Sequence, residues 1–531
     1  MMQVQGTSIL PQIAIGKIRF LQVQPQRHAE YGESPEKERE RFVRAREAAG
    51  ARLTKLYEKA CQEAGADEAE ILEVHRMLLE DEDFADAVEA GLEAGYSAEA
   101  AVMQAGEQIA ALFRTMDAYM RARAADILDV AQSLVRALSG AAEAALEEPA
   151  IVMAEDLAPS TTVQLDKRFL LGFVTSGGSA NSHTAILSRT MSIPALIQTP
   201  IDPAWDGKQA ILDGRTGTLY IEPEEATCQQ LSAARDQLLA EREALCALRG
   251  LPAQTSSGQR VLTYANVGSI SDVELAVKND AEGIGLFRSE FLFLGREDYP
   301  TEQEQYDVYC RILELMQGKR VIVRTMDIGA DKKIGYFQLD EEENPALGLR
   351  GIRLCLVRRE VFRTQLRALL RAAAKGRLSV MYPMITSAEE ILEVRTLVQA
   401  VYEELCTQKI ECALPEQGIM IETPAAAIIA DELAPMVDFF SIGTNDLIQY
   451  TLAADRQNAR LGRFCDPYHP AVRRLIRGVV EAAHQAGIWA GICGELAADP
   501  VMTQSFVELG IDELSVSPGA VLPLRAAVRA L

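Results

Sequence analysis

The chain has 531 residues, of which 48% are hydrophobic, and its formal net charge is −24. This length predicts three or four domains, each with enough apolar residues for a core. The acidic balance excludes nucleic acid as a partner, because no basic stripe is present to neutralise phosphates. It favours a basic protein partner instead.

Compartment and membrane association follow from composition. None of the nine cysteines forms a CxxC pair, and the first residues do not have the pattern of a signal peptide. These features predict a reducing, cytoplasmic location. No apolar run is long enough to cross a bilayer, so no membrane insertion is expected.

The first half of the chain reads as an α/β domain interrupted by helices. Residues 1–24 and 146–222 contain β-branched runs and turn pairs, which predict one α/β domain. Residues 25–145 read as helices throughout, with Ser34-Pro35 and Ser97 as helix starts. The apolar spacing of Tyr119–Leu138 is typical of a helix bundle. The acidic run Glu80–Asp83 is expected on a solvated face.

A small-residue loop in the α/β domain presents a histidine. His183 follows Gly177-Gly178-Ser179-Ala180-Asn181-Ser182 and precedes an apolar run that reads as a helix. Free N–H groups and the positive dipole end at a helix start favour an anion. We predict that His183 accepts a phosphoryl group; the alternative is a helix-capping loop with an incidental histidine.

Residues 223–259 connect the two halves. Residues 224–249 predict a helix that ends at Gly250. Leu251–Gln259, with its proline and its Thr-Ser-Ser-Gly run, predicts a linker. The remaining residues, 260–531, form the second half of the chain.

The second half alternates short apolar runs with segments of helical length. Eight such units over about 270 residues favour a (β/α)8 barrel of the TIM type; a doubly wound sheet is the alternative. The predicted strands are Leu262–Asn266, Gly283–Arg288, Val321–Asp327, Val380–Met384, Gly418–Glu422, Phe439–Asp446, Trp489–Cys493 and Leu514–Ser517.

Polar residues end several of these runs, where the chemistry of such barrels resides. Arg288 and Arg324 are suited to carboxylate and phosphate oxygens. Glu422 and Asp446 are hard oxygen ligands of the kind that hold Mg²⁺ together with a substrate phosphate, and Asn445 can donate to the same anion. Cys493 places a thiol at another strand end. Individually each could be structural, but their joint occurrence favours a site.

These runs resemble phosphoenolpyruvate–protein phosphotransferase, enzyme I of the bacterial sugar phosphotransferase system. The similarity extends over nearly the whole chain in the family's order, including Ser182-His183-Thr184. The matching runs are Ala281–Phe291, Val323–Gly329, Glu342–Pro345, Ile421–Ala427, Phe439–Leu447 and Cys493–Ala497.

The resemblance implies a function and roles for the residues. Phosphoenolpyruvate would be bound by Arg288, Arg324, Asn445, Asp446 and Arg456, and Mg²⁺ by Glu422 and Asp446. His183 would take the phosphoryl group on Nε2 and pass it to a histidine of the phosphocarrier HPr, which docks on the helical domain. Cys493 would protonate the leaving enolpyruvate to pyruvate. The phosphohistidine domain would swivel between the two sites, and the barrel would form a homodimer.

Two alternatives to this function are open. Pyruvate phosphate dikinase and phosphoenolpyruvate synthase share the phosphohistidine loop and the barrel, but they also need an ATP-binding domain for which this chain has no glycine-rich loop. A non-catalytic regulatory homologue is the second alternative. The presence of His183, Glu422, Asp446 and Cys493 argues against it.

Overall fold

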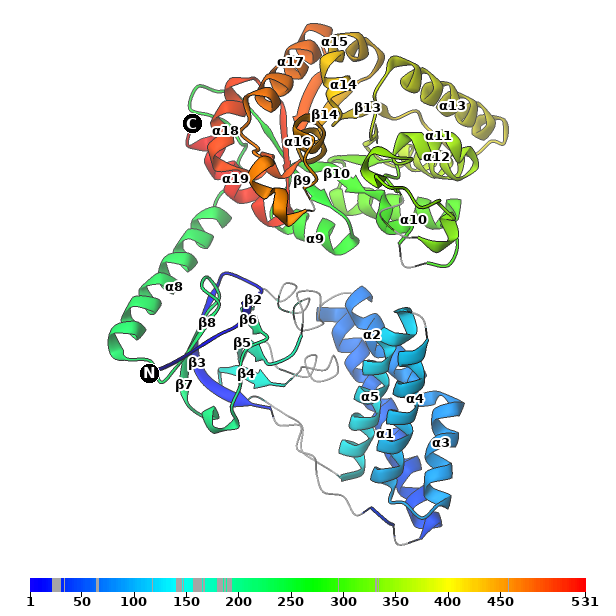
Figure 1. The fold of residues 1–531 in the computed structure, drawn as a ribbon, viewed down its shortest axis with the longest axis vertical. Coiled ribbons are helices and arrows are strands. Elements are labelled where there is room, and N and C mark those ends of the chain that lie inside the picture. Colours follow the sequence, from blue (N-terminus) through cyan, green and yellow to red (C-terminus); the bar gives the residue numbers. More distant parts are fainter. Residues whose placement is uncertain are drawn as a thin grey trace. The chain divides into compact units, whose positions relative to one another are not determined.

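The protein divides into two compact units, Met1–Glu241 and Arg242–Leu531 (Figure 1). The computed structural model describes residues 1–21, 30–32, 34–63, 66–116, 118–139, 146, 148–155, 165, 168–178, 185, 188, 193–294, 296–329, 332, 334–456 and 458–531. Each unit has its own apolar cores.

The first unit contains an eight-stranded mixed sheet with the order β1-β8-β7-β3-β4-β5-β6-β2. Strands β3, β4, β5 and β6 pair in parallel, while the pairs at both ends of the sheet are antiparallel. The strands are β1 Met2–Gln5, β2 Thr7–Ser8, β3 Ile13–Phe20, β4 Ala150–Ala154, β5 Leu170–Thr175, β6 Ala195–Ile197, β7 Gln209–Asp213 and β8 Thr218–Ile221.

Helices separate β3 from β4 in the chain, as the sequence predicts. Ser97 caps its helix by accepting a hydrogen bond from Ala100 N at 3.2 Å, and Asp81, in the acidic run, caps another through Phe84 N at 3.1 Å. Buried residues such as Phe84, Val102 and Leu134 form a core of their own. The helices are α1 Pro35–Glu63, α2 Ala66–Glu80, α3 Glu82–Glu93, α4 Ala98–Thr115 and α5 Ala118–Ser139.

The connecting helix, α8, spans Glu225–Cys246. Its residue Leu231 is buried against Ile13 and Ile211 of the first unit's sheet. The segment expected as a linker, residues 251–259, packs on the barrel, because Ala253 is fully buried and accepts a hydrogen bond from Val261 N at 3.0 Å.

The second unit is a closed barrel of parallel strands, in the order β10-β11-β12-β13-β14-β15-β16-β9. Figure 1 shows helices surrounding these strands. The predicted (β/α)8 fold is confirmed, and the doubly wound sheet is excluded. The strands are β9 Leu262–Val267, β10 Gly283–Arg288, β11 Arg320–Arg324, β12 Leu378–Tyr382, β13 Glu416–Ile421, β14 Phe439–Ile442, β15 Trp489–Ile492 and β16 Glu513–Val516.

Helices follow the barrel strands in turn. The predicted run Phe439–Asp446 is longer than the strand found, because β14 ends at Ile442 and Gly443 caps the next helix, which carries Asp446 in its first turn. The helices are α9 Ile270–Lys278, α10 Glu302–Met316, α11 Ile352–Val357, α12 Arg359–Ala373, α13 Ala388–Thr407, α14 Pro424–Ile428, α15 Ala430–Leu433, α16 Thr444–Leu452, α17 Pro470–Ala486, α18 Pro500–Glu508 and α19 Val521–Arg529.

The barrel has two apolar layers. A large outer core fills the space between strands and helices, and a smaller cluster, including Leu286, Met420 and Cys493, fills the interior. Among the described residues, no helix is long and apolar enough to cross a membrane.

Candidate active site

The candidate residues converge on one rim of the barrel. Arg288 and Arg324 are the last residues of β10 and β11, Glu422 directly follows β13, and Cys493 directly follows β15. Asp446 lies in the first turn of α16, just beyond β14. Because all strands of the barrel are parallel, their carboxyl ends meet at the same rim.

A chain of buried ion pairs crosses this rim. Arg324 Nη1 lies 3.2 Å from Asp327 Oδ2, and Arg350 Nη2 lies 2.7 Å from the same oxygen. Arg350 Nη2 is also 3.3 Å from Asp446 Oδ2. Arg324 donates a further hydrogen bond to Glu290 Oε1 at 3.0 Å. We call Glu290, Arg324, Asp327, Arg350, Glu422 and Asp446 the rim cluster.

Asp327 and Arg324 of the rim cluster stay charged despite their burial. Burial alone raises the pKa of Asp327, but the charges of Arg324 and Arg350 outweigh it and lower the pKa to about 2. Burial likewise opposes protonation of Arg324, yet the carboxylates around it, first Glu290 and then Asp327, raise its pKa. These groups therefore present fixed charges at the rim.

The pKa of Glu422 is shifted in the opposite direction to that of Asp327. The Glu422 side chain is 1% exposed, and its pKa is raised well above the ordinary value, first by burial and then by the charges of Asp446 and Asp327. Its Oε1 accepts a hydrogen bond from Met384 N at 2.7 Å. Met384 has a φ of 60°, a conformation that is rare for residues other than glycine and that concentrates at functional sites.

The donor set fits a divalent cation. Glu422 and Asp446 are carboxylates that repel each other electrostatically in a buried place, and Asp446 Oδ1 is buried without a hydrogen-bond partner. Among the described residues no group of three acidic, histidine or cysteine side chains could hold a metal. Two carboxylates completed by substrate and water oxygens are the arrangement that Mg²⁺ accepts.

Cys493 lies below the rim in an apolar setting. Its side chain is 4% exposed and packs in the barrel interior with Met420 and Phe439. Its Sγ lies 3.8 Å from the carbonyl oxygen of Ile442. Burial raises the pKa of the thiol to about 12. The thiol is therefore protonated at neutral pH.

The other predicted residues lie around the rim cluster. Arg288 is exposed and has no ion-pair partner among the described residues. Arg456 Nη2 lies 3.6 Å from Asp446 Oδ1, with its side chain 45% exposed. Asn445 and Glu495 bind each other, with Asn445 Nδ2 donating to Glu495 Oε1 at 3.2 Å and Glu495 N donating to Asn445 Oδ1 at 3.1 Å.

The structure adds residues that the sequence prediction missed. The sequence pattern predicts no role for Glu290, Asp327 or Arg350, although Glu290 and Asp327 lie within the runs that match the family. Arg350 occurs in a loop, 96 residues from the Asp446 that it contacts. Tyr450 of α16 accepts a hydrogen bond from Arg350 Nη1 at 3.2 Å and helps to hold this loop.

His183 and its neighbours at 179–184 lie outside the described residues. Its role as phosphoryl acceptor therefore stays a prediction. Gly177, at the start of that loop, is held by a hydrogen bond from its N to the carbonyl oxygen of Glu155 at 2.9 Å.

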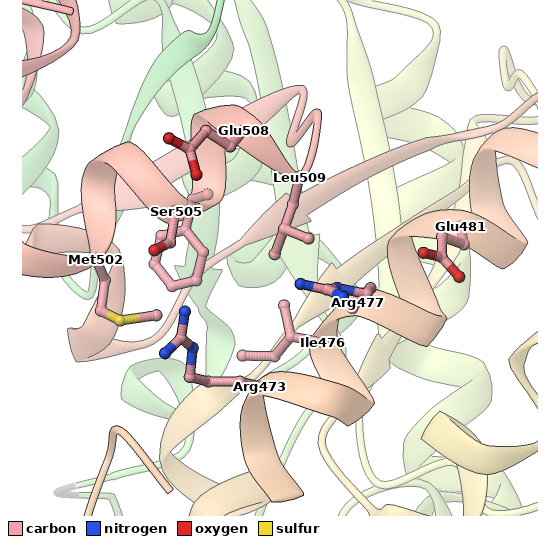
Figure 2. A pocket seen from close by; sticks show the side chains of 9 residues that line it. Arg473, Ile476, Arg477, Glu481, Met502, Ser505, Glu508 and Leu509 are labelled. Carbon is pink, nitrogen blue, oxygen red and sulfur yellow. The ribbon is translucent and has the colours of Figure 1, made fainter. Parts of the chain in front are cut away.

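A separate hollow lies on the outer wall of the barrel. It has a volume of about 360 Å³ and lies between α17 and α18, where Arg473 and Arg477 face Met502, Ser505 and Leu509 (Figure 2). None of its lining residues belongs to the rim cluster, and Ile476 and Phe506 make its floor apolar. The fixed charges and the perturbed carboxylate place the candidate active site at the rim instead.

Family models cover most of the chain. A model described as PEP-utilising enzyme, N-terminal, matches residues 5–123, and one described as PEP-utilising enzyme, mobile domain, matches residues 146–217. A third, PEP-utilising enzyme, PEP-binding domain, matches residues 242–531, which include the barrel and its rim cluster. The chain therefore has the domains of the PEP-utilising enzymes.

Individual relatives narrow this class. The phosphoenolpyruvate-protein phosphotransferases of Staphylococcus carnosus (strain TM300) and Bacillus subtilis (strain 168) are 39% and 40% identical to this chain. The matches cover 100% of it and 94% and 95% of those proteins. An NMR solution structure of an Enzyme I protein is 31% identical, covering 44% of this chain and 99% of that one, with a TM-score of 0.39. The chain belongs to the phosphoenolpyruvate-protein phosphotransferase family.

Proposed function

We propose that this protein takes the phosphoryl group of phosphoenolpyruvate on His183, passes it to a histidine of the phosphocarrier HPr and releases pyruvate. Family membership supports the reaction. The structural observation that carries the proposal is the rim cluster, where buried arginines and carboxylates keep fixed charges at the carboxyl ends of barrel strands. Such a site suits a small dianionic or trianionic substrate.

The arginines predicted to bind substrate have different roles. Among them, Arg288 and Arg456 have exposed side chains, so they are available to the carboxylate and phosphate of an incoming phosphoenolpyruvate. Arg324 is oriented by Glu290 and Asp327 and holds its charge without rearrangement. Preoriented charge of this kind stabilises the transition state more than a mobile side chain does.

Glu422 and Asp446 would hold Mg²⁺, which when bound offsets the negative charge that develops on the transferring phosphate. Burial raises the pKa of Glu422, and repulsion from Asp446 raises it further. The bound ion would relieve this repulsion. Arg350, 3.3 Å from Asp446 Oδ2, would keep that carboxylate oriented.

Phosphoryl transfer to His183 forms one bond for each bond that it breaks. A lone pair of the neutral His183 imidazole forms the new N–P bond as the bridging P–O bond breaks, and enolpyruvate leaves with that electron pair. The Cys493 thiol then gives its proton to the methylene carbon, which yields pyruvate. The burial that raises the thiol pKa to about 12 keeps this proton available at neutral pH.

Partners and assembly follow the same proposal. The helices α1–α5 would dock HPr, and the exposed run Glu80–Asp83, where α2 ends and α3 begins, offers acidic groups to a basic partner. The barrel would form a homodimer, and the protein would act in the cytoplasm.

Labelled phosphoenolpyruvate tests the proposal directly. With Mg²⁺ and without ATP, we expect acid-labile, base-stable label on the wild type and none on His183→Ala. His484→Gln, which changes an exposed histidine paired with Asp512, serves as the matched control and should label normally. Label persisting on His183→Ala would remove His183 as the acceptor, and a requirement for ATP would favour the dikinase alternative.

A further inference from the structure

Two cysteines face each other at the end of α13. Cys406 lies in the last turn of this helix and Cys412 in the segment that follows, and their Sγ atoms are 3.8 Å apart. The eight described cysteines are all free thiols, and this is the one pair among them whose sulfur atoms are in contact. A disulfide bond needs a separation of about 2.05 Å, so rotation of the side chains has less than 2 Å to cover.

The backbone brings the two thiols together through a sharp reversal. Lys409 has a φ of 58°, in the left-handed region that ends many helices. Its N donates to the carbonyl oxygen of Cys406 at 3.0 Å, and Ile410 N donates to that of Leu405 at 3.0 Å. Ile410 then packs against the outer core of the barrel. The reversal is thus held by hydrogen bonds and burial.

Contacts with α12 hold both sides of the reversal. On the helix side, Arg367 Nη1 donates to Glu404 Oε1 at 2.6 Å and its Nη2 donates to Gln408 Oε1 at 3.0 Å. On the far side, Ala413 N donates to the carbonyl oxygen of Leu370 at 2.9 Å. The short distance between the two thiols is therefore built into the packing of α13 on α12.

We propose that Cys406 and Cys412 are a redox modification site that forms a reversible intramolecular disulfide with a small-molecule disulfide as the oxidant. The thiolate of Cys406 attacks one sulfur of the oxidant, which breaks its S–S bond and releases one thiolate. The Cys412 thiolate then attacks the mixed disulfide at the Cys406 sulfur and releases the second. The protein loses two electrons and two protons, and the oxidant is reduced to two thiols.

The environments of the two thiols assign the order of attack. Cys406 is exposed, so an oxidant reaches it first, whereas Cys412 is half-buried. Burial, and then the neighbouring Cys406, raises the pKa of Cys412, which makes it the poorer first nucleophile. Proximity compensates for this in the second step, because the mixed disulfide forms beside it.

The site lies away from the candidate active site. Strand β12 ends at Tyr382 on the rim that carries the rim cluster, and α13 runs from Ala388 back to Thr407. The end of α13 is therefore at the opposite end of the barrel. We expect the disulfide to close the reversal covalently without changing the binding of phosphoenolpyruvate at the rim.

Oxidised glutathione tests the proposal on the full-length protein. The wild type should lose two of its nine thiols, and its mass should fall by two hydrogen atoms with no glutathione retained. Peptide mapping should place the cross-link between residues 406 and 412. Cys412→Ser should instead retain one glutathione on Cys406, while Cys406→Ser should react far more slowly. Dithiothreitol should restore all thiols in the wild type.

Cys310→Ser is the matched control, because Cys310 is a partly buried cysteine on α10 without a facing sulfur in the described residues. It should form the disulfide as the wild type does. Stable glutathione adducts on both Cys406 and Cys412 of the wild type, or a cross-link to any other cysteine, would overturn the proposal. Retention of all nine thiols under conditions that oxidise a model dithiol would overturn it as well.

Discussion

Asp327 at the rim of the barrel and Glu513 in its interior are both buried carboxyl groups, yet their pKa values are shifted in opposite directions. At the rim, Asp327 is bound by two arginines and stays charged, with its pKa lowered to about 2 after their charges outweigh the effect of burial. Below the rim, Glu513 of β16 has neither carboxyl oxygen hydrogen-bonded to a described residue, and burial raises its pKa well above the ordinary value. Cys493 follows the second pattern.

The difference lies in partners rather than in depth, because Asp327 and Glu513 are 3% and 1% exposed. Glu513 lies over Gly491 of the neighbouring strand, where a Cβ would come within 1.9 Å of its Oε2. The glycine gives the carboxyl group room but no hydrogen bond. A buried acid with paired cations is a fixed charge, and one without them is a neutral proton carrier. The rim thus supplies charge to the proposed reaction, and Cys493 in the interior supplies the proton.

The largest expected effect concerns the protonated thiol. Cys493→Ala should slow pyruvate formation by about 10²–10⁴-fold, the usual contribution of a positioned general acid, while the affinity for phosphoenolpyruvate changes little. Steady-state pyruvate release and equilibrium binding would separate the two quantities. Cys310→Ala is the control and should keep wild-type turnover. Unchanged pyruvate release in Cys493→Ala would mean that another group or water donates the proton.

Breaking the charged layer should cost stability. Asp327→Asn leaves Arg324 and Arg350 without their shared carboxylate, and removal of one partner from a buried ion pair costs about 3–5 kcal/mol of unfolding free energy. Urea unfolding in a Trp205→Phe background would report on the barrel through Trp489, since the chain has two tryptophans. Trp489 stacks on Phe439 with ring centroids 4.5 Å apart.

The exposed pair Arg311–Glu314 on α10 of the barrel unit provides the comparison for that measurement. Glu314→Gln should change stability by no more than about 0.5 kcal/mol, because solvent screens an exposed pair. Equal effects of the two substitutions would contradict the importance given to the rim ion pairs.

Glu422→Gln tests the cation assigned to the rim. The change keeps the shape and the hydrogen bond from Met384 N but removes a charge, so Mg²⁺-dependent turnover should fall about a hundredfold. Isothermal titration with Mg²⁺ would show the loss of binding separately from activity. Glu416→Gln, at the opposite end of the same strand, should stay within about twofold of the wild type. Full turnover in Glu422→Gln would exclude Glu422 as a ligand.

The smallest expected effect is on the pH dependence of stability, and it concerns the buried carboxyl group of Glu513. A glutamate in the unfolded chain has a pKa of about 4.3, and that of Glu513 is raised in the folded state, first by burial, with Arg320 opposing the rise. Between these two pKa values the folded state binds more protons, so its stability falls as pH rises. Glu513→Gln should remove this contribution, which makes its stability flatter than that of the wild type between about pH 5 and 8.

Urea unfolding at several pH values, again through Trp489, would measure the difference. Glu422, whose pKa is also raised, is present in both proteins and cancels in the comparison. Arg320, Tyr264, Asp512 and Cys493, the other ionisable groups that act on or respond to Glu513, are likewise present in both proteins. Parallel pH profiles for the two proteins would show that Glu513 is ionised in the folded state.

The sequence by itself determined the barrel and most of its rim. Short apolar runs that end in polar residues alternate with helix-length segments, and this local pattern follows from burial of parallel strands on both faces. It placed Arg324, Glu422 and Cys493 at strand ends, where the structure has them. The helix starts at Pro35 and after Ser97 could also be predicted from the sequence, because capping depends on neighbouring residues.

Only the tertiary structure decided which of these groups meet and what charge they carry. Arg350 contacts Asp446 across 96 residues, and the reversal at Lys409 brings Cys406 to Cys412; no short-range pattern encodes either contact. The protonation of Cys493 and Glu513 depends on surroundings assembled from several strands. Local propensities are set along the chain, whereas electrostatic energies depend on distances that exist only after folding.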